Sequence, residues 1–65
     1  MSTPRLPVNP GSIVRHKMGG PKMVVYGTWH SETYNRDYYC CRWWDAEYEK
    51  FRREDFTRDE LQRLG

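Results

Sequence analysis

Four side chains in this 65-residue sequence have the chemistry to bind a metal or attack a substrate: His16, His30, Cys40 and Cys41. Zinc sites usually take ligands at Cys-x-x-Cys or His-x-x-x-His spacing, and neither spacing occurs here. A nucleophilic cysteine needs a histidine and an orienting acid beside it, and no motif of that kind is present. We therefore expect no metal, no cofactor, no catalysis and no small-molecule substrate, and interpret the cysteines as structural.

The two cysteines also indicate a compartment. They are adjacent in the sequence, and neighbours on a strand point to opposite faces, so the pair is poorly placed to form a disulfide. A small secreted domain would carry more cysteines at wider spacing. No apolar run has the length of a membrane span, and residues 1–11 lack the apolar core of a signal peptide. These features predict a cytoplasmic protein that does not bind membranes.

Binding chemistry is better represented than catalytic chemistry. Three Trp, five Tyr and two Phe are more large rings than so small a body can bury, and exposed aromatic residues often mark contact sites. The net charge is +2. Residues 1–31 hold four basic residues and no acidic one, whereas residues 32–65 hold seven basic and nine acidic residues. The first part of the chain is therefore a modest positive patch.

The predicted binding surface combines cations of a first hairpin with cations and rings of later strands. Its members are Arg15, Lys17, Lys22, Tyr26, Tyr38, Arg42 and Trp44. Lysine or arginine interleaved with aromatic rings can hold single-stranded nucleic acid, since cations neutralise phosphates and rings stack on bases. Exposed Trp, Tyr and Arg also dominate the energetics of protein interfaces. A purely structural interpretation remains, in which the lysines solubilise an edge strand and the rings pack inside.

Charge decides between the two classes of partner. Three or four cations give only weak, salt-dependent affinity for nucleic acid, and the acidic residues around Glu47 and Glu54 would repel it. We expect a non-enzymatic binding module with a protein partner, such as an inhibitor or adaptor from a bacterium, phage or mobile element. Weak binding of single-stranded DNA or RNA is the alternative, and the oligomeric state stays open.

Short strands must position these side chains. Gly19 and Gly20 can adopt positive φ, and Pro21 lacks an N–H donor, so it suits the start of a strand rather than its middle. Because β-forming residues flank this structural turn, the sequence predicts strands over about residues 12–17 and 21–29. The prolines of residues 1–10 predict an extended arm before the domain of residues 11–65.

Later elements follow from alternation and capping. A third strand is predicted over residues 38–44, with Tyr39, Cys41 and Trp43 on its core face. Alternation along residues 21–29 places Met23, Val25 and Trp29 on one shared face. Residues 45–55 fit either a helix or a fourth strand over 47–53. Thr57 and Glu60 have the spacing of a capping box, which predicts a helix over residues 58–64 that docks Leu61 and Leu64.

The order of several of these residues resembles the YodC-like family of small bacterial proteins. The resemblance runs from about Pro10 to Leu61 and rests on Lys17-Met18-Gly19-Gly20-Pro21-Lys22-Met23 followed by Cys41-Arg42-Trp43. It implies a small SH3-like β-barrel, and it favours the strand over the helix for residues 47–53. The expected fold is therefore mostly β, an SH3-like barrel of four to five antiparallel strands with a short C-terminal helix.

Overall fold

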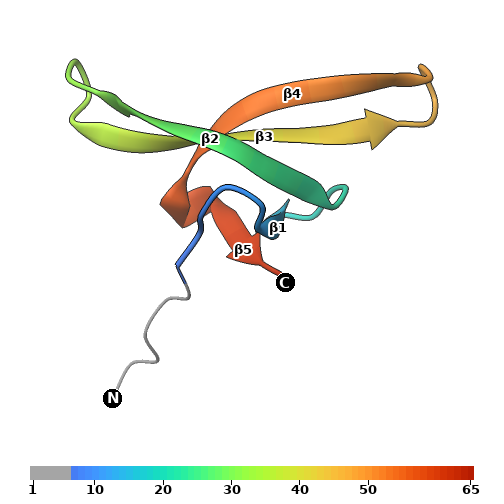
Figure 1. Cartoon of the computed structure of the whole chain (residues 1–65), viewed down its shortest axis with the longest axis horizontal. Coiled ribbons are helices and arrows are strands. Elements are labelled where there is room, and N and C mark those ends of the chain that lie inside the picture. Colours follow the sequence, from blue (N-terminus) through green and yellow to red (C-terminus); the bar gives the residue numbers. More distant parts are fainter. Residues whose placement is uncertain (1–6) are drawn as a thin grey trace.

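The computed structural model describes residues 7–65, which form one antiparallel sheet (Figure 1). Its five strands have the order β4-β3-β2-β1-β5. Their bounds are β1 (Ile13–His16), β2 (Met23–Ser31), β3 (Arg36–Asp45), β4 (Lys50–Thr57) and β5 (Leu61–Arg63). Among the described residues β4 and β5 are edges that do not pair with each other, so the sheet is open. The prediction of a mostly β fold is confirmed.

The predicted glycine turn joins β1 to β2. Gly19 has a φ of 105° and Gly20 a φ of 124°, values that a residue with a Cβ resists. The Gly19 N–H donates to the His16 carbonyl over 2.9 Å, which closes the turn. Val14 of β1 then pairs with Met23 at the start of β2. The turn therefore fixes the register of the first hairpin.

The core lies where the short strands β1 and β5 meet the long β2–β3 ribbon (Figure 1). Fully or almost fully buried side chains come from β1, β2, β3 and β5, and Val8 of the segment before β1 joins them. Tyr39, Trp43 and Phe56 pack against this cluster. The predicted core face of the third strand is confirmed. Residues 1–6 of the predicted arm lie outside the described residues. The buried hydrophobic residues are Val8, Val14, Met23, Val25, Cys41 and Leu61.

A β-bulge in β2 changes the direction of its later side chains. The pairing with β3 shifts between Val25 and Gly27, which leaves Tyr26 as an extra residue. One extra residue reverses the alternation of everything that follows. Trp29 therefore lies opposite Tyr38 on the face turned away from the core, which we call the outer face. The prediction that Trp29 shares a face with Met23 and Val25 was wrong.

Residues 46–49 form the turn between β3 and β4. The Asp45 Oδ1 accepts from the backbone N–H of Glu47 at 3.0 Å and of Tyr48 at 3.3 Å, and Glu49 has a φ of 51°. Side-chain acceptance of this kind stabilises a turn and competes with a helix. The open choice between helix and strand is thus settled in favour of a strand, which begins at Lys50 rather than at residue 47.

The C-terminal α-helix predicted over residues 58–64 was wrong. The capping pair forms, because Glu60 Oε1 accepts from the Thr57 backbone N–H at 3.0 Å. The helical segment is only a 3-10 turn, Arg58–Glu60. The chain then extends as β5, in which Leu61 pairs with His16 of β1 and is buried. The edge of β1 supplies hydrogen-bond partners for the backbone N–H and C=O groups of residues 61–63. A helix of two turns would have to form these bonds within itself and is unstable alone.

This turn predicts a pH dependence of stability. The Thr57 backbone N–H holds the pKa of Glu60 below its ordinary value, and the Thr57 hydroxyl and His16 add to the effect against the opposing influence of burial. A lowered pKa in the folded state stabilises the protein above the ordinary carboxyl pKa, and that contribution is lost as pH falls through the folded pKa. We expect Glu60→Gln to reduce stability at neutral pH by about 0.5–1 kcal/mol.

The measurement is a series of urea titrations from neutral to acid pH. The difference in unfolding free energy between wild type and Glu60→Gln should shrink as the pH falls below the ordinary carboxyl range. Glu32→Gln, in the exposed loop after β2, is the matched control and should follow wild type. A constant difference at all pH values would contradict the prediction.

Candidate aromatic and cationic interface

The outer face carries a cluster of exposed rings around one guanidinium. The Arg42 Cζ lies 6.0 Å from the Tyr26 ring centroid and 5.7 Å from that of Phe51. The Trp44 and Phe51 rings meet edge to face with centroids 5.1 Å apart. Tyr26, Trp44 and Phe51 are 45%, 53% and 66% exposed. We call Tyr26, Arg42, Trp44 and Phe51 the outer cluster.

The strand register builds this cluster. Trp44 pairs with Phe51 across β3 and β4, and Arg42 pairs with Arg53 two residues along the same ladder. Val24 of β2 pairs with Arg42 from the other side. Directly opposed residues of an antiparallel pair project to the same face. Arg42, Trp44 and Phe51 therefore sit on regular strand backbone, and Tyr26 joins them from the bulge of β2.

Charge around the outer cluster has one sign. Two shallow hollows border the cluster, and the residues that line them include four basic side chains and no acidic one among the described residues. Arg52 is neutralised by Asp45 on the inner face, at 3.1 Å. The other basic side chains, Lys22, Arg42 and Arg53, leave the outer face positive.

The structure brings some predicted binding residues together and separates others. Lys22 lines the same hollow as Arg42 and Trp44. Tyr38 stacks on Trp29 with ring centroids 4.7 Å apart, farther along the outer face. The Trp29 indole Nε1–H also donates to Asp55 Oδ2 over 2.8 Å.

Two predicted cations of the first hairpin lie away from the cluster. Arg15 is beside β5, where its Nη2 donates to Gln62 Oε1 at 3.4 Å. Lys17 follows β1, and its backbone N–H donates to the Glu60 carbonyl. Sequence reasoning missed Phe51 and Arg53. Alternation along β4 was the available signal, but the register that places them beside the cluster depends on the four-residue turn.

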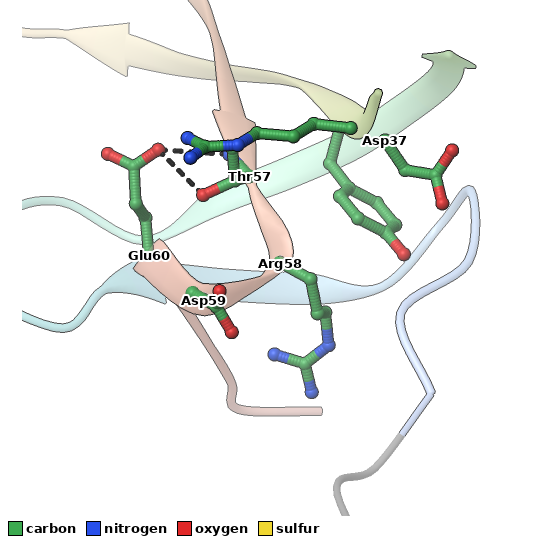
Figure 2. A pocket seen from close by; sticks show the side chains of 7 residues that line it. Asp37, Thr57, Arg58, Asp59 and Glu60 are labelled. Carbon is green, nitrogen blue, oxygen red and sulfur yellow. Dashed lines mark hydrogen bonds between the residues drawn. The ribbon is translucent and has the colours of Figure 1, made fainter. Parts of the chain in front are cut away.

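A separate hollow lies at the 3-10 turn (Figure 2). Asp37, Thr57, Arg58, Asp59 and Glu60 surround it. Arginines and carboxylates are mixed along its wall, and Thr57 and Glu60 already bond to each other. A wall of mixed, internally bonded charges selects no ligand class, so this hollow is the weaker candidate.

The two thiols differ in access. Cys41 is fully buried on the inner face, and burial, with smaller effects of Cys40 and Asp55, raises its pKa to about 11. Cys40 is partly exposed, and burial together with a hydrogen bond to Asp55 raises its pKa as well. Both are free. Thiolate is the reactive form, so neither environment activates a nucleophile.

Thiol labelling therefore has a predicted order. In Cys41→Ala the remaining Cys40 should react slowly with a disulfide reagent in native buffer. In Cys40→Ser the remaining Cys41 should react only when the protein unfolds, so its rate should rise with urea and follow the unfolded fraction. Rapid modification of Cys41 in native buffer would contradict its burial.

Two further features bear on function. Within residues 7–65 no three metal-ligating side chains gather at one place. In the same part of the chain, no helix has the length and apolar character that crossing a bilayer requires.

These observations define the class of the molecule: a small antiparallel β protein with an exposed aromatic and cationic face. The chain belongs to the family described as "Uncharacterized small protein (DUF2158)", whose model matches residues 9–61. The match includes β1, β2, β3 and β4 in full and ends at Leu61, the first residue of β5. No curated protein and no solved structure matches the chain.

Proposed function

We propose that this protein is a non-enzymatic binding module whose outer cluster docks a partner protein. The observation that carries the proposal is the Arg42 guanidinium between two exposed rings, with Trp44 beside them. Arg, Trp and Tyr are the residues that contribute most to protein interfaces. Cation–π contacts hold the guanidinium in one place and so lower the entropy it would lose on binding.

Fold supports the same proposal. Strand order β4-β3-β2-β1-β5 with a 3-10 turn before the last strand is the arrangement expected of an SH3-like barrel, and Leu61 of β5 shares the core with Cys41 of β3. We take the sheet to be an SH3-like barrel left open between β4 and β5. Two free thiols suit the reducing cytoplasm, where we place the protein.

Single-stranded nucleic acid is the second candidate, because no acidic residue lines the two hollows beside the cluster. The contacts that the aromatic rings already make favour a protein partner. Arg42 already occupies ring faces of Tyr26 and Phe51, and Trp29 and Tyr38 stack on each other. Base stacking needs free ring faces, and each of these four rings already has a contact with Arg42 or with the neighbouring ring.

A pull-down from the native host with point variants tests the proposal. Trp44→Ala and Phe51→Ala should each abolish capture of the partner while the melting temperature stays close to that of wild type. Tyr34→Ala is the matched control, since Tyr34 is 69% exposed in the turn between β2 and β3. Capture that survives both cluster variants would refute the proposal.

Salt separates the two candidates. Affinity for a single-stranded oligonucleotide should be undetectable at low ionic strength if the partner is protein. If the partner is nucleic acid, the affinity should fall steeply with salt, and Lys22→Ala should flatten the slope by about one ion.

A further inference from the structure

The outer face holds two arginines that face each other without a counter-charge. Arg42 of β3 and Arg53 of β4 are directly opposed in the register. Like charges at directly opposed positions of an antiparallel pair are destabilising. Within residues 7–65 neither guanidinium has an ion pair with a carboxylate. The sheet therefore keeps an unfavourable pair at the centre of its exposed face.

Acidic residues nearby make their contacts with other groups. Asp55, the next outward residue of β4, accepts from the Trp29 indole at 2.8 Å. Glu54 lies opposite Cys41, so it belongs to the inner face. Asp45 pairs with Arg52 on that same face. Among the described residues, no carboxylate therefore forms an ion pair with either arginine.

We propose that the Arg42–Arg53 pair receives the carboxylates of an acidic segment of the partner protein, with an apolar side chain of that segment against Trp44 and Phe51. This inference rests on the proposed function and names the chemistry of its partner. Guanidinium groups match carboxylates in geometry and bind them through paired hydrogen bonds. Apolar area lies directly alongside, since Ile13 and Val24 line the same hollow.

The small extent of the positive surface favours a peptide over a polynucleotide as the partner. Along β4 the outward residues are Phe51, Arg53 and Asp55, so one cation stands between a ring and an acid. A phosphate backbone needs a continuous track of cations. A segment with two or three carboxylates and one apolar anchor matches the patch as it stands.

Two synthetic peptides provide the probe. One alternates Asp with Leu and Phe, and the other has Asn in place of every Asp. Amide NMR spectra of the full chain at low ionic strength should show shifts at Val24, Arg42, Phe51 and Arg53 with the acidic peptide. The neutral peptide should bind about tenfold more weakly. An oligothymidylate that binds this face more tightly than the acidic peptide would overturn the inference in favour of nucleic acid.

Variants make the test independent of the peptide sequence. Arg53→Glu places opposite charges on β3 and β4, so it should raise the melting temperature by roughly 2–5 °C. The same variant should lose the acidic peptide and the host partner. Lys50→Gln, on the opposite face of β4, is the matched control and should keep both. A lower melting temperature or retained binding in Arg53→Glu contradicts the inference.

The pull-down distinguishes this inference from the proposed function. Capture that depends on Trp44 but not on Arg53 would refute the acidic partner and leave the binding module in place. Capture that depends on neither residue would refute both.

Discussion

Leu61→Ala is expected to lower the free energy of unfolding by about 2–5 kcal/mol. Leu61 is 1% exposed and is the largest fully buried side chain of the described core. Small domains are only marginally stable, so a loss of this size is a large share of the total. Leu61 also joins β5 to His16 of β1, and its loss would loosen the edge strand together with the core.

Thermal and urea denaturation followed by tryptophan fluorescence measure the effect. The melting temperature of Leu61→Ala should fall by roughly 10 °C or more. Leu64→Ala is the matched control, since Leu64 is 39% exposed and should cost little. Similar losses for the two variants would place Leu61 outside the core.

Gly20→Ala is expected to destabilise the protein by about 1–3 kcal/mol. Its φ of 124° lies in a region that side chains rarely adopt, although no atom lies within 4 Å of the added Cβ. The cost therefore comes from the backbone and not from a clash. Gly27→Ala has the same open space without a positive φ, so it should be neutral or stabilising. Equal denaturation midpoints for the two variants would contradict this account of the turn.

Predictable features of this fold are those that depend on a few neighbouring residues. Two glycines and a proline predicted the first hairpin, and alternation along residues 38–44 predicted the face with Cys41. Both concern contacts close in the chain, where backbone preference and burial agree. The capping pair Thr57 and Glu60 was also predicted, since it too is local.

Errors arose where distant strands decide the outcome. Residues 61–63 form a strand because they pair with the edge of β1. The spacing of residues 57–64 cannot predict this pairing, since β1 lies more than 40 residues earlier in the chain. Likewise, the outer cluster depends on the register of β3 and β4. A four-residue turn brings Phe51 opposite Trp44, whereas the predicted strands 38–44 and 47–53 leave only residues 45–46 between them and would not. Three of the four cluster residues were named from sequence, and Phe51 was the one that needed the register.

The extra residue at Tyr26 divides the β2–β3 ribbon into two segments with opposite phase. Before it, the odd-numbered residues Met23 and Val25 face the interior, whereas after it the odd-numbered Trp29 lies on the outer face. Deleting Tyr26 would join the two segments into one regular ladder, with Thr28 still opposite Tyr39 and Trp29 still opposite Tyr38. Loss or gain of the bulged residue would therefore change the local bend of the ribbon but not the face on which each later side chain lies. A length difference at this one position is accordingly compatible with the same core and the same outer face.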